Sequence, residues 1–244
     1  MAEPRETLLI YRRSLAAQRR GRYVAGSSAH PDRMAPDLAG LLIRDYTQPG
    51  DLILDPFAGI GTTLVEAIDA GRDALGVEHD PGWVALSRAN IAAARRRGAT
   101  GRGRIVRGDA TRLLACVPPA LRGRITLILT AAPSGRTMPR RRRSRSDTAI
   151  SHVDVADGLT ATLTSCTRLL KPGGLIVLVS RPNQHDDTRV GAHLTVVDRR
   201  RAAHAVLRDG CLLPPHGTPP GSPIRYDDIT VLTPARAAVA GRHG

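Results

Sequence analysis

The stretch that decides the fold is D-P-F-A-G-I-G-T-T, residues 55–63, which stands between two segments of different periodicity. Before it, residues 51–54 form a short apolar run that predicts a strand. After it, residues 62–70 carry apolar side chains at helical spacing and end at Gly71. Glycines at a strand-to-helix junction let the backbone approach a ligand closely, and a helix N-terminus favours a negatively charged group. We therefore expect a ligand site at residues 55–63.

Alternating segments continue along the rest of the chain. Helices are predicted at 38–46, 81–97, 159–170 and 199–208, strands at 73–78, 104–106, 125–130, 175–179 and 228–232, and a turn at 171–174. Strands that alternate with helices favour a mostly parallel sheet covered on both faces. The sequence thus predicts an α/β fold with a doubly wound sheet in one domain over residues 29–235. A basic arm is expected at 1–28 and a tail at 236–244.

The residues around the glycines indicate which ligand the site takes. Leu64 stands where the dinucleotide motif G-x-G-x-x-G would have its third glycine or an alanine. Asp55, at the end of the strand, would repel a pyrophosphate but attract the ammonium of a methionine moiety. The helix start at Thr62 could receive the carboxylate of the same moiety. The chemistry therefore favours a zwitterionic cofactor over a dinucleotide.

Two further acidic residues end the next two strands. Glu78 could accept hydrogen bonds from both hydroxyls of a ribose, and Asp109 could accept one from an adenine amino group. With Asp55 they would lie on the carboxyl edge of a parallel sheet, where such folds bind ligands. The alternative is that each acid only caps the helix that follows it. The combination of three acids with a glycine loop favours the cofactor site.

The pattern D-P-F-A-G-x-G-T-T resembles the S-adenosylmethionine (SAM) loop of methyltransferases that modify exocyclic amino groups in DNA, and of related RNA guanine-N2 enzymes. Residues 29–34, A-H-P-D-R-M, are similar to the His-Pro segment that precedes this loop, and the similarity covers roughly residues 28–182. The resemblance implies a Rossmann-like class I SAM methyltransferase fold with SAM as cofactor. Asp55 would hold the methionine amine, Glu78 the ribose and Asp109 the adenine, with His79 and Ala110 beside the adenine. Carried over, the cofactor-binding residues are Asp55, Pro56, Phe57, Ala58, Gly59, Gly61, Thr62, Glu78, His79, Asp109 and Ala110.

The catalytic motif departs from that family. There the fourth strand ends in Asp, Asn or Ser, followed by two prolines and an aromatic residue that stacks on the flipped base. Here the catalytic positions carry Ala131, which has no acceptor, Pro133 as the one proline kept, and Ser134, which cannot stack. Losing one positioned polar group costs about 2.7–4 kcal/mol and losing a base stack roughly 1–3 kcal/mol. The rate would fall by on the order of 10³ to 10⁵. We hypothesise weakened or altered catalysis unless Thr130, Ser134 or a neighbour compensates.

The charge of the chain points to a polyanionic partner. The net charge is +14, and the predicted loop at 135–147 follows the catalytic positions directly. We expect it to bind nucleic acid, DNA rather than RNA, through Arg136, Arg140, Arg141, Arg142, Arg143 and Arg145. However, Lys171 is the only lysine among the 36 basic residues. A GC-rich genome would favour arginine whatever the function, so a solvated loop remains the alternative.

Cysteine spacing and hydropathy bound the remaining possibilities. Cys116, Cys166 and Cys211 are far apart and favour a reducing cytoplasm, with neither disulfides nor a metal site. No run of about 18 apolar residues predicts a membrane span. The predicted function is a SAM-dependent methyltransferase of an exocyclic amino group in DNA. The alternatives are an inactive relative that binds SAM or nucleic acid, an RNA guanine-N2 enzyme, or a small-molecule methyltransferase.

Overall fold

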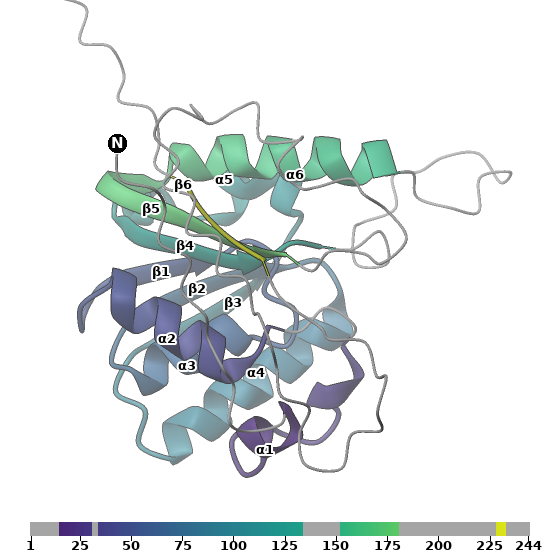
Figure 1. Ribbon diagram of the computed structural model, residues 1–244, viewed down its shortest axis with the longest axis vertical. Coiled ribbons are helices and arrows are strands. Elements are labelled where there is room, and N and C mark those ends of the chain that lie inside the picture. The colour runs from purple at the N-terminus through teal and green to yellow at the C-terminus, as the bar shows by residue number, and fades with distance from the viewer. Residues whose placement is uncertain (1–14, 31–33, 134–151, 181–227, 233–244) are drawn as a thin grey trace, which may run out of the picture.

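The computed structural model describes residues 15–30, 34–133, 152–180 and 228–232 (Figure 1). In these segments six strands form one sheet in the order β3-β2-β1-β4-β5-β6. The strands are β1 (Leu52–Asp55), β2 (Asp73–Glu78), β3 (Gly103–Arg107), β4 (Ile125–Ala131), β5 (Leu170–Ser180) and β6 (Asp228–Leu232). All neighbouring pairs are parallel except β5 and β6, which are antiparallel. The predicted mostly parallel sheet is therefore confirmed.

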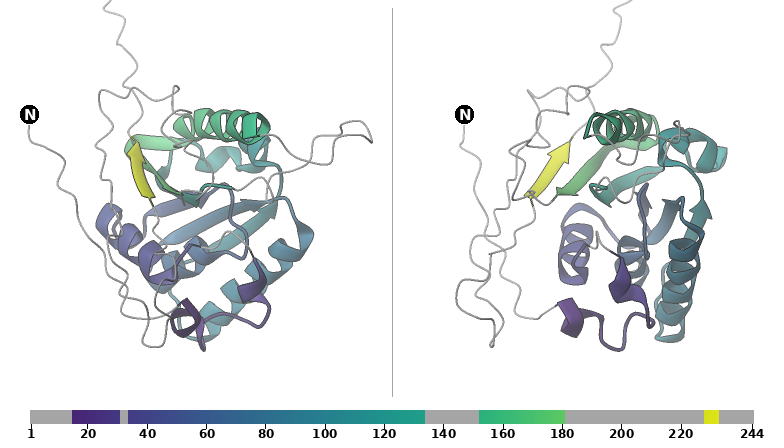
Figure 2. Two further views of the ribbon diagram at one scale, coloured as in Figure 1. Left: turned by 45° about the vertical axis from the view of Figure 1, so that its right-hand side comes forward. Right: turned by 90° about the vertical axis from the view of Figure 1, so that its right-hand side faces the viewer.

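Helices cover both faces of the sheet, as the alternating pattern predicts. The α-helices are α1 (Leu15–Arg19), α2 (Pro36–Tyr46), α3 (Thr62–Asp69), α4 (Pro81–Arg96), α5 (Leu113–Cys116) and α6 (His152–Thr167). Short 3-10 turns are η1 (Ser27–Ala29), η2 (Ala110–Arg112) and η3 (Pro119–Leu121). Figure 2 shows α2, α3 and α4 on one face and α5 and α6 on the other. The sheet is thus doubly wound.

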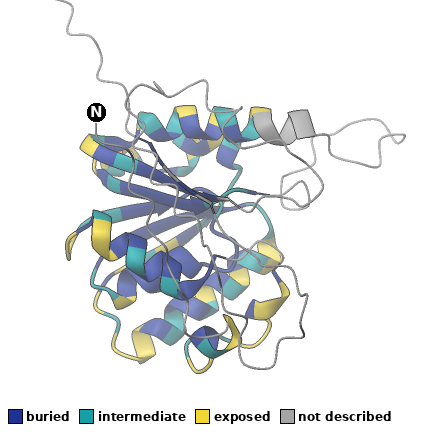
Figure 3. Cartoon of the chain, in the orientation of Figure 1, coloured by how far each residue is buried: buried dark blue, intermediate teal, exposed yellow. Residues whose placement is uncertain are grey.

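Successive side chains of a central strand serve the two faces in turn. In β1, Ile53 packs into the core beneath α2, α3 and α4, whereas Leu54 packs into the core on the α5 and α6 side. In β4, Leu127 and Ile128 divide in the same way, and all four side chains are fully buried. Figure 3 shows the central strands of the sheet mostly in the colour of buried residues. Each such side chain contributes roughly 1.5–3 kcal/mol through burial. Strands buried on both faces explain why the sequence shows continuous apolar runs here rather than alternation.

The order of the strands fixes where a ligand can bind. From β1 the chain builds outward through β2 and β3, then crosses to the other side of β1 to form β4. The carboxyl ends of β1 and β4 therefore flank the point where the winding reverses, and open α/β sheets bind ligands there. Ile53 pairs with Leu127 and Leu54 with Ile128. This register brings Asp55, the last residue of β1, beside the end of β4.

One element differs from its prediction. The helix expected to reach residue 170 ends at Thr167, and Leu170 begins β5. Leu170 pairs with Ile125, and the register then jumps to Leu127 beside Leu175, so the predicted turn is an irregularity inside the strand. Gly173 takes a left-handed φ of 78° there. Because Leu170 lies four residues after Cys166, its spacing fitted a helix although it packs from a strand.

Three predicted segments lie outside the described residues: the helix at 199–208, the loop at 135–147 and the tail at 236–244. Within the described part of the chain, none of the helices has the length and apolar character needed to cross a membrane.

Candidate functional site

Asp55 is a buried carboxylate at the point where the winding reverses. Its side chain is 4% exposed, and Oδ1 accepts hydrogen bonds from Thr130 Oγ1 at 2.7 Å and from the Phe57 amide at 3.0 Å. Burial raises the pKa of Asp55 to about 6 and Glu78 adds to the rise, against hydrogen bonds from Thr63, Thr130 and Phe57. Across the described ranges, no Arg, Lys or His forms an ion pair with Asp55. Within the part of the chain that the structure describes, the site therefore presents a carboxylate without a positive partner.

The two glycines of the loop bring its backbone against other parts of the protein. Gly59 and Gly61 both have left-handed φ values, 50° and 82°. A Cβ at Gly59 would lie 2.8 Å from Nε2 of His30, and a Cβ at Gly61 would collide with the hydroxyl of Ser87 in α4. The glycines are thus needed for packing of the loop against residues 15–30 and α4, in addition to any role in the approach of a ligand.

Helix α3 begins directly after the loop, at Thr62. Its N-cap is Gly61, which provides no side-chain hydrogen bond to the first turn. The amide of Gly61 donates to the Ala58 carbonyl at 2.7 Å, which tightens the loop before the helix. The positive end of the helix dipole therefore faces this loop without an acidic cap, an arrangement that suits a carboxylate.

Glu78 ends β2 and ties it to the glycine loop. Its Oε2 accepts from the Gly59 amide at 2.9 Å, and Oε1 accepts from the Asp80 amide at 2.8 Å and lies 3.1 Å from His79 Nδ1. Burial raises the pKa of Glu78, but the hydrogen bonds from His79, Asp80 and Gly59 together hold it below its ordinary value. A carboxylate offers about four acceptor positions. These three contacts leave Glu78 capacity for a further donor.

Asp109 follows β3 and makes contacts of a different kind. Its Oδ1 accepts from the Thr111 amide at 2.9 Å and from Thr111 Oγ1 at 2.8 Å, which caps η2. The capping alternative expects this contact of Asp109, and the predicted contact with adenine stays a prediction. The capping alternative does not describe Asp55 or Glu78, because the N-caps of α3 and α4 are Gly61 and Asp80. His79 is half-exposed beside Glu78, and Ala110 is buried.

The predicted catalytic positions lie at the end of β4. Ala131 pairs with Val179 of β5, the Ala132 amide donates to the Val179 carbonyl at 2.7 Å, and Pro133 is buried. Thr130 is fully buried, and its hydroxyl is bonded to Asp55. The Thr130 hydroxyl is thus already engaged with Asp55, and the idea that it compensates for the missing catalytic acceptor stays a prediction. Ser134 and the six arginines of the 135–147 loop lie outside the described residues.

Asn90 is a residue of the site region that the sequence analysis missed. It is fully buried in α4; its amide NH2 donates to the Ile60 carbonyl of the loop at 2.9 Å, and Oδ1 accepts from the Val24 amide at 2.8 Å. Ser87 and Asn90 are three residues apart on the buried face of a helix that is otherwise rich in alanine. The amide of Asn90 at core spacing was the available signal, because buried polar side chains are in most cases hydrogen-bonded. Ser87 Oγ, by contrast, has no hydrogen-bond partner within the described residues.

Residues 15–30 pack on the helices beside the loop. Arg22 forms ion pairs with Glu66 at 2.7 Å and Asp69 at 2.9 Å, and the Tyr23 hydroxyl donates to Glu66 at 2.7 Å. The His30 ring lies edge-on to Trp83 with centroids 4.8 Å apart. The part of the predicted arm that the structure describes thus contacts α3 and α4.

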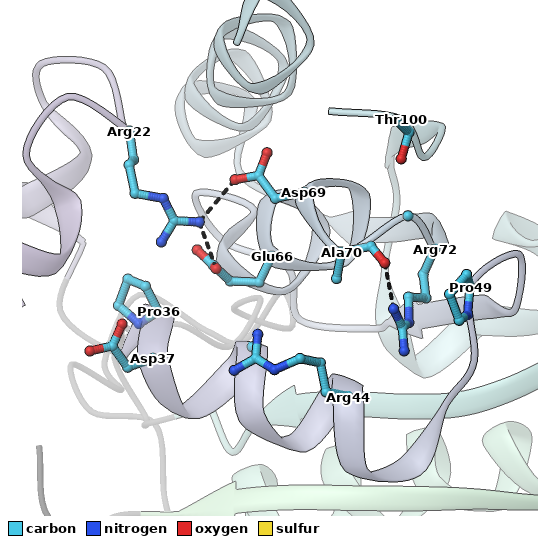
Figure 4. Close-up of a pocket in the computed structure, with 12 residues that line it drawn as sticks. Arg22, Pro36, Asp37, Arg44, Pro49, Glu66, Asp69, Ala70, Arg72 and Thr100 are labelled. Carbon is cyan, nitrogen blue, oxygen red and sulfur yellow. Dashed lines mark hydrogen bonds and ion pairs between the residues drawn. The ribbon is translucent and has the colours of Figure 1, made fainter. Parts of the chain in front are cut away.

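A separate hollow of about 710 Å³ opens between α2 and α3 (Figure 4). Its charged lining residues are Arg22, Asp37, Arg44, Glu66, Asp69 and Arg72. Arg22 is paired with Glu66 and Asp69, and Arg72 donates to the Thr47 carbonyl at 2.7 Å. None of the predicted site residues lines this hollow, so its volume says nothing about the cofactor site.

Comparison with known proteins agrees with the geometry. Residues 9–89 match a family model described as DNA methylase. The chain is 31% identical over 67 residues to the type II methyltransferase M.MjaII of Methanocaldococcus jannaschii, a match that covers 28% of this chain and 13% of that protein. It is 44% identical over 50 residues to the type II methyltransferase M.BglI of Bacillus subtilis, covering 20% and 14%. The resemblance to amino-directed DNA methyltransferases is thus confirmed, over a small part of those relatives.

The fold is also found among solved structures. The crystal structure of TrmN from Thermus thermophilus aligns with a TM-score of 0.55 and 22% identity, covering 90% of this chain and 53% of that chain. At this level of identity the similarity shows the fold. The predicted class I methyltransferase fold is confirmed.

Proposed function

We propose that this chain binds SAM at the carboxyl ends of β1 and β2 and transfers its methyl group to an exocyclic amino group of a nucleic acid base, in DNA rather than RNA. The observation that carries the proposal is the buried Asp55 carboxylate, which has no cationic partner among the described residues. A buried charge is costly unless it is paired. The ammonium of the methionine moiety supplies the missing positive charge.

The surrounding residues fit the rest of that cofactor. The start of α3 lies one short loop away from Asp55 and has no side-chain cap, which suits the methionine carboxylate. Glu78 retains acceptor capacity for a ribose hydroxyl beside its three protein contacts. We assign the adenine end to His79, Asp109 and Ala110. SAM, when bound, supplies an electrophilic methyl group.

The matches with type II methyltransferases and the net charge of +14 support DNA as the substrate. In this proposal residues 29–235 form one domain, and the six arginines of the 135–147 loop contact phosphates. Because the matched segments cover 13–14% of those two relatives, the substrate rests on this proposal rather than on the comparisons alone.

Catalysis is proposed to be weak because Ala131 stands at the end of β4 where the family has a polar acceptor. Thr130, the polar residue beside it, is buried and bonded to Asp55, so it provides no substitute. The double variant Ala131→Asp plus Ser134→Tyr is expected to raise turnover on mixed DNA by about 10³-fold, through a restored acceptor and a restored stack. Radiolabelled methyl transfer measures the gain.

The exposed Ala120 in η3 offers a matched control. Ala120 precedes the start of β4, so Ala120→Asp adds the same carboxylate away from the carboxyl end of that strand and should leave turnover unchanged. If the parent chain is already as fast as the double variant, the weakened-catalysis proposal is wrong.

The proposal as a whole is tested by two measurements in sequence. Calorimetric titration with SAM comes first, and the absence of binding at millimolar SAM would exclude a SAM enzyme. Transfer of labelled methyl to DNA, RNA or a metabolite pool then identifies the substrate class. Binding without transfer to any pool would instead favour the inactive relative, for which the altered residues at 131 and 134 are the specific evidence.

A further inference from the structure

Thr130 occupies an unusual position for a hydroxyl group. It is fully buried in β4, one residue before the end of the strand, and faces the last residue of the neighbouring strand β1. Its Oγ1 donates to Asp55 Oδ1 at 2.7 Å. The contact of the same hydroxyl with the Ala131 carbonyl is 3.5 Å, too long to compete. The hydroxyl is therefore committed to Asp55.

We propose that Thr130 is a positioning residue of the cofactor site, whose hydroxyl holds the Asp55 carboxylate in its ionised form, ready for the ammonium of SAM. This inference rests on the proposed function. The proposal assigns Thr130 a role in the cofactor site, whereas the position of Thr130 beside the catalytic motif had suggested a role in methyl transfer.

The reason lies in the preference of a hydroxyl for the charged form of its acceptor. A hydrogen bond to a carboxylate is stronger than one to a neutral carboxylic acid, so the Thr130 hydroxyl favours the ionised state. The β-branched side chain has few rotamers in a strand, which keeps the hydroxyl on Asp55 at little further entropic cost. Valine has nearly the same shape but cannot donate a hydrogen bond. Thr130→Val therefore removes the donor and preserves the packing.

The other described groups that act on Asp55 come from α3, the glycine loop, β2 and α6. Thr63 from α3 and the Phe57 amide of the loop also donate to the carboxylate, and Glu78 from β2 opposes its ionisation through its own negative charge. Cys166 from α6 lies near Asp55, but burial raises the pKa of its thiol, so it stays neutral. Among the described residues, Thr130 is thus one of three donors that counteract the effects of burial and of Glu78 on Asp55.

The chain contains a matched control for this contact. At the other end of the same two strands, Thr126 Oγ1 donates to Asp51 Oδ1, also at 2.7 Å. Thr126→Val removes the same kind of bond from the same strand pair, at the edge away from the cofactor site.

The experiment follows the Asp55 carboxyl by ¹³C NMR in the cofactor-free protein and measures SAM affinity by calorimetry from about pH 5 to about pH 8. Thr130→Val is expected to move the Asp55 midpoint upward by about one pH unit and to displace the pH dependence of SAM affinity in the same direction. Thr130→Ser should restore both, because it restores the donor. Thr126→Val should change neither.

The outcomes separate this inference from the function on which it rests. If Thr130→Val leaves the Asp55 midpoint unchanged, the positioning role is refuted. If the midpoint moves but the parent chain does not bind SAM, the proposed function fails and the Thr130 contact stands. If Thr130→Val does not fold, Thr130→Ala removes the same donor with less bulk, and its midpoint decides the question.

Discussion

The two ends of the β1–β4 strand pair have the same hydrogen bond between a threonine and an aspartate, but the surroundings of the two aspartates differ. Asp51 and Asp55 each accept a threonine hydroxyl from β4 at 2.7 Å. Asp51 has a side chain that is 20% exposed, and Lys171 Nζ lies 2.9 Å from it. Asp55 is 4% exposed and has no cation beside it in the described part of the chain.

The same contrast appears in the acidity of the two groups. Burial alone would raise the pKa of Asp51, but the Gln48 amide, Thr126 and Lys171 together lower it. For Asp55 burial prevails and the pKa rises to about 6. The charge of Asp51 is therefore balanced by Lys171, whereas Asp55 has no cation to balance its charge among the described residues. Such locally unfavourable groups persist where binding requires them.

The largest effect is expected when the charge of each end is removed in turn. Asp55→Asn keeps the size of the side chain but removes the partner of the methionine ammonium, so SAM affinity should fall by about 10² to 10³-fold. Asp51→Asn should change SAM affinity by no more than about twofold, because the charge of Asp51 is paired with Lys171. Calorimetry at pH 7.5 compares the two variants. If both variants lost the same amount of SAM affinity, the two aspartates would not differ in their contribution to SAM binding.

The next effect concerns stability, where the two ends should respond with opposite signs. A carboxyl whose folded pKa lies above its unfolded value of 3.8 stabilises the fold fully below that value and loses this contribution as the pH rises through about 6. Asp55→Asn should therefore raise the free energy of unfolding above pH 7, by up to about 3 kcal/mol. Asp51→Asn should lower it, because the folded pKa of Asp51 is depressed.

Urea unfolding of the cofactor-free protein at about pH 4, 6 and 8 measures both variants. The gain from Asp55→Asn should be small at the lowest pH and grow toward the highest. A loss at pH 8 would mean that the Asp55 charge is compensated in the folded protein, and the contrast between the two ends would disappear.

Much of this arrangement could be predicted from the sequence because it is local. A strand, a glycine loop and a helix follow one another within residues 51–70, and apolar periodicity alone places them. The same locality explains why the acids at strand ends were found, since each follows its own strand directly. The comparisons bear out the predicted fold and cofactor, while the roles of the individual site residues remain predictions.

What the sequence could not give are contacts between distant segments. Asp55 and Thr130 are 75 residues apart, and Asn90 and Val24 are 66 apart. Thr130 was considered for catalysis because it stands next to the altered motif in the chain. The register of β1 and β4, which depends on strand order, places its hydroxyl against the Asp55 carboxylate. The prediction that the helix reaches Leu170 was wrong for a related reason. A spacing of four residues cannot distinguish a residue of a helix from one in a strand that begins just after the helix.

The smallest effect is expected at Lys171, and it tests whether the two ends are independent. Lys171→Met removes the cation that pairs with Asp51 but keeps most of the apolar part of the Lys171 side chain. Because the Lys171 side chain is 40% exposed, the pair is screened by water, and the loss of stability at pH 7 should stay within about 1 kcal/mol. The depressed pKa of Asp51 contributes stability above pH 3.8, so the loss should fade as the pH falls below that value. SAM affinity and the Asp55 midpoint should not change, since Asp51 and Lys171 lie at the opposite edge of the sheet. A shift in either would show that a change of charge at one end of β1 alters the electrostatics at the other end, and the two aspartates would then not be independent.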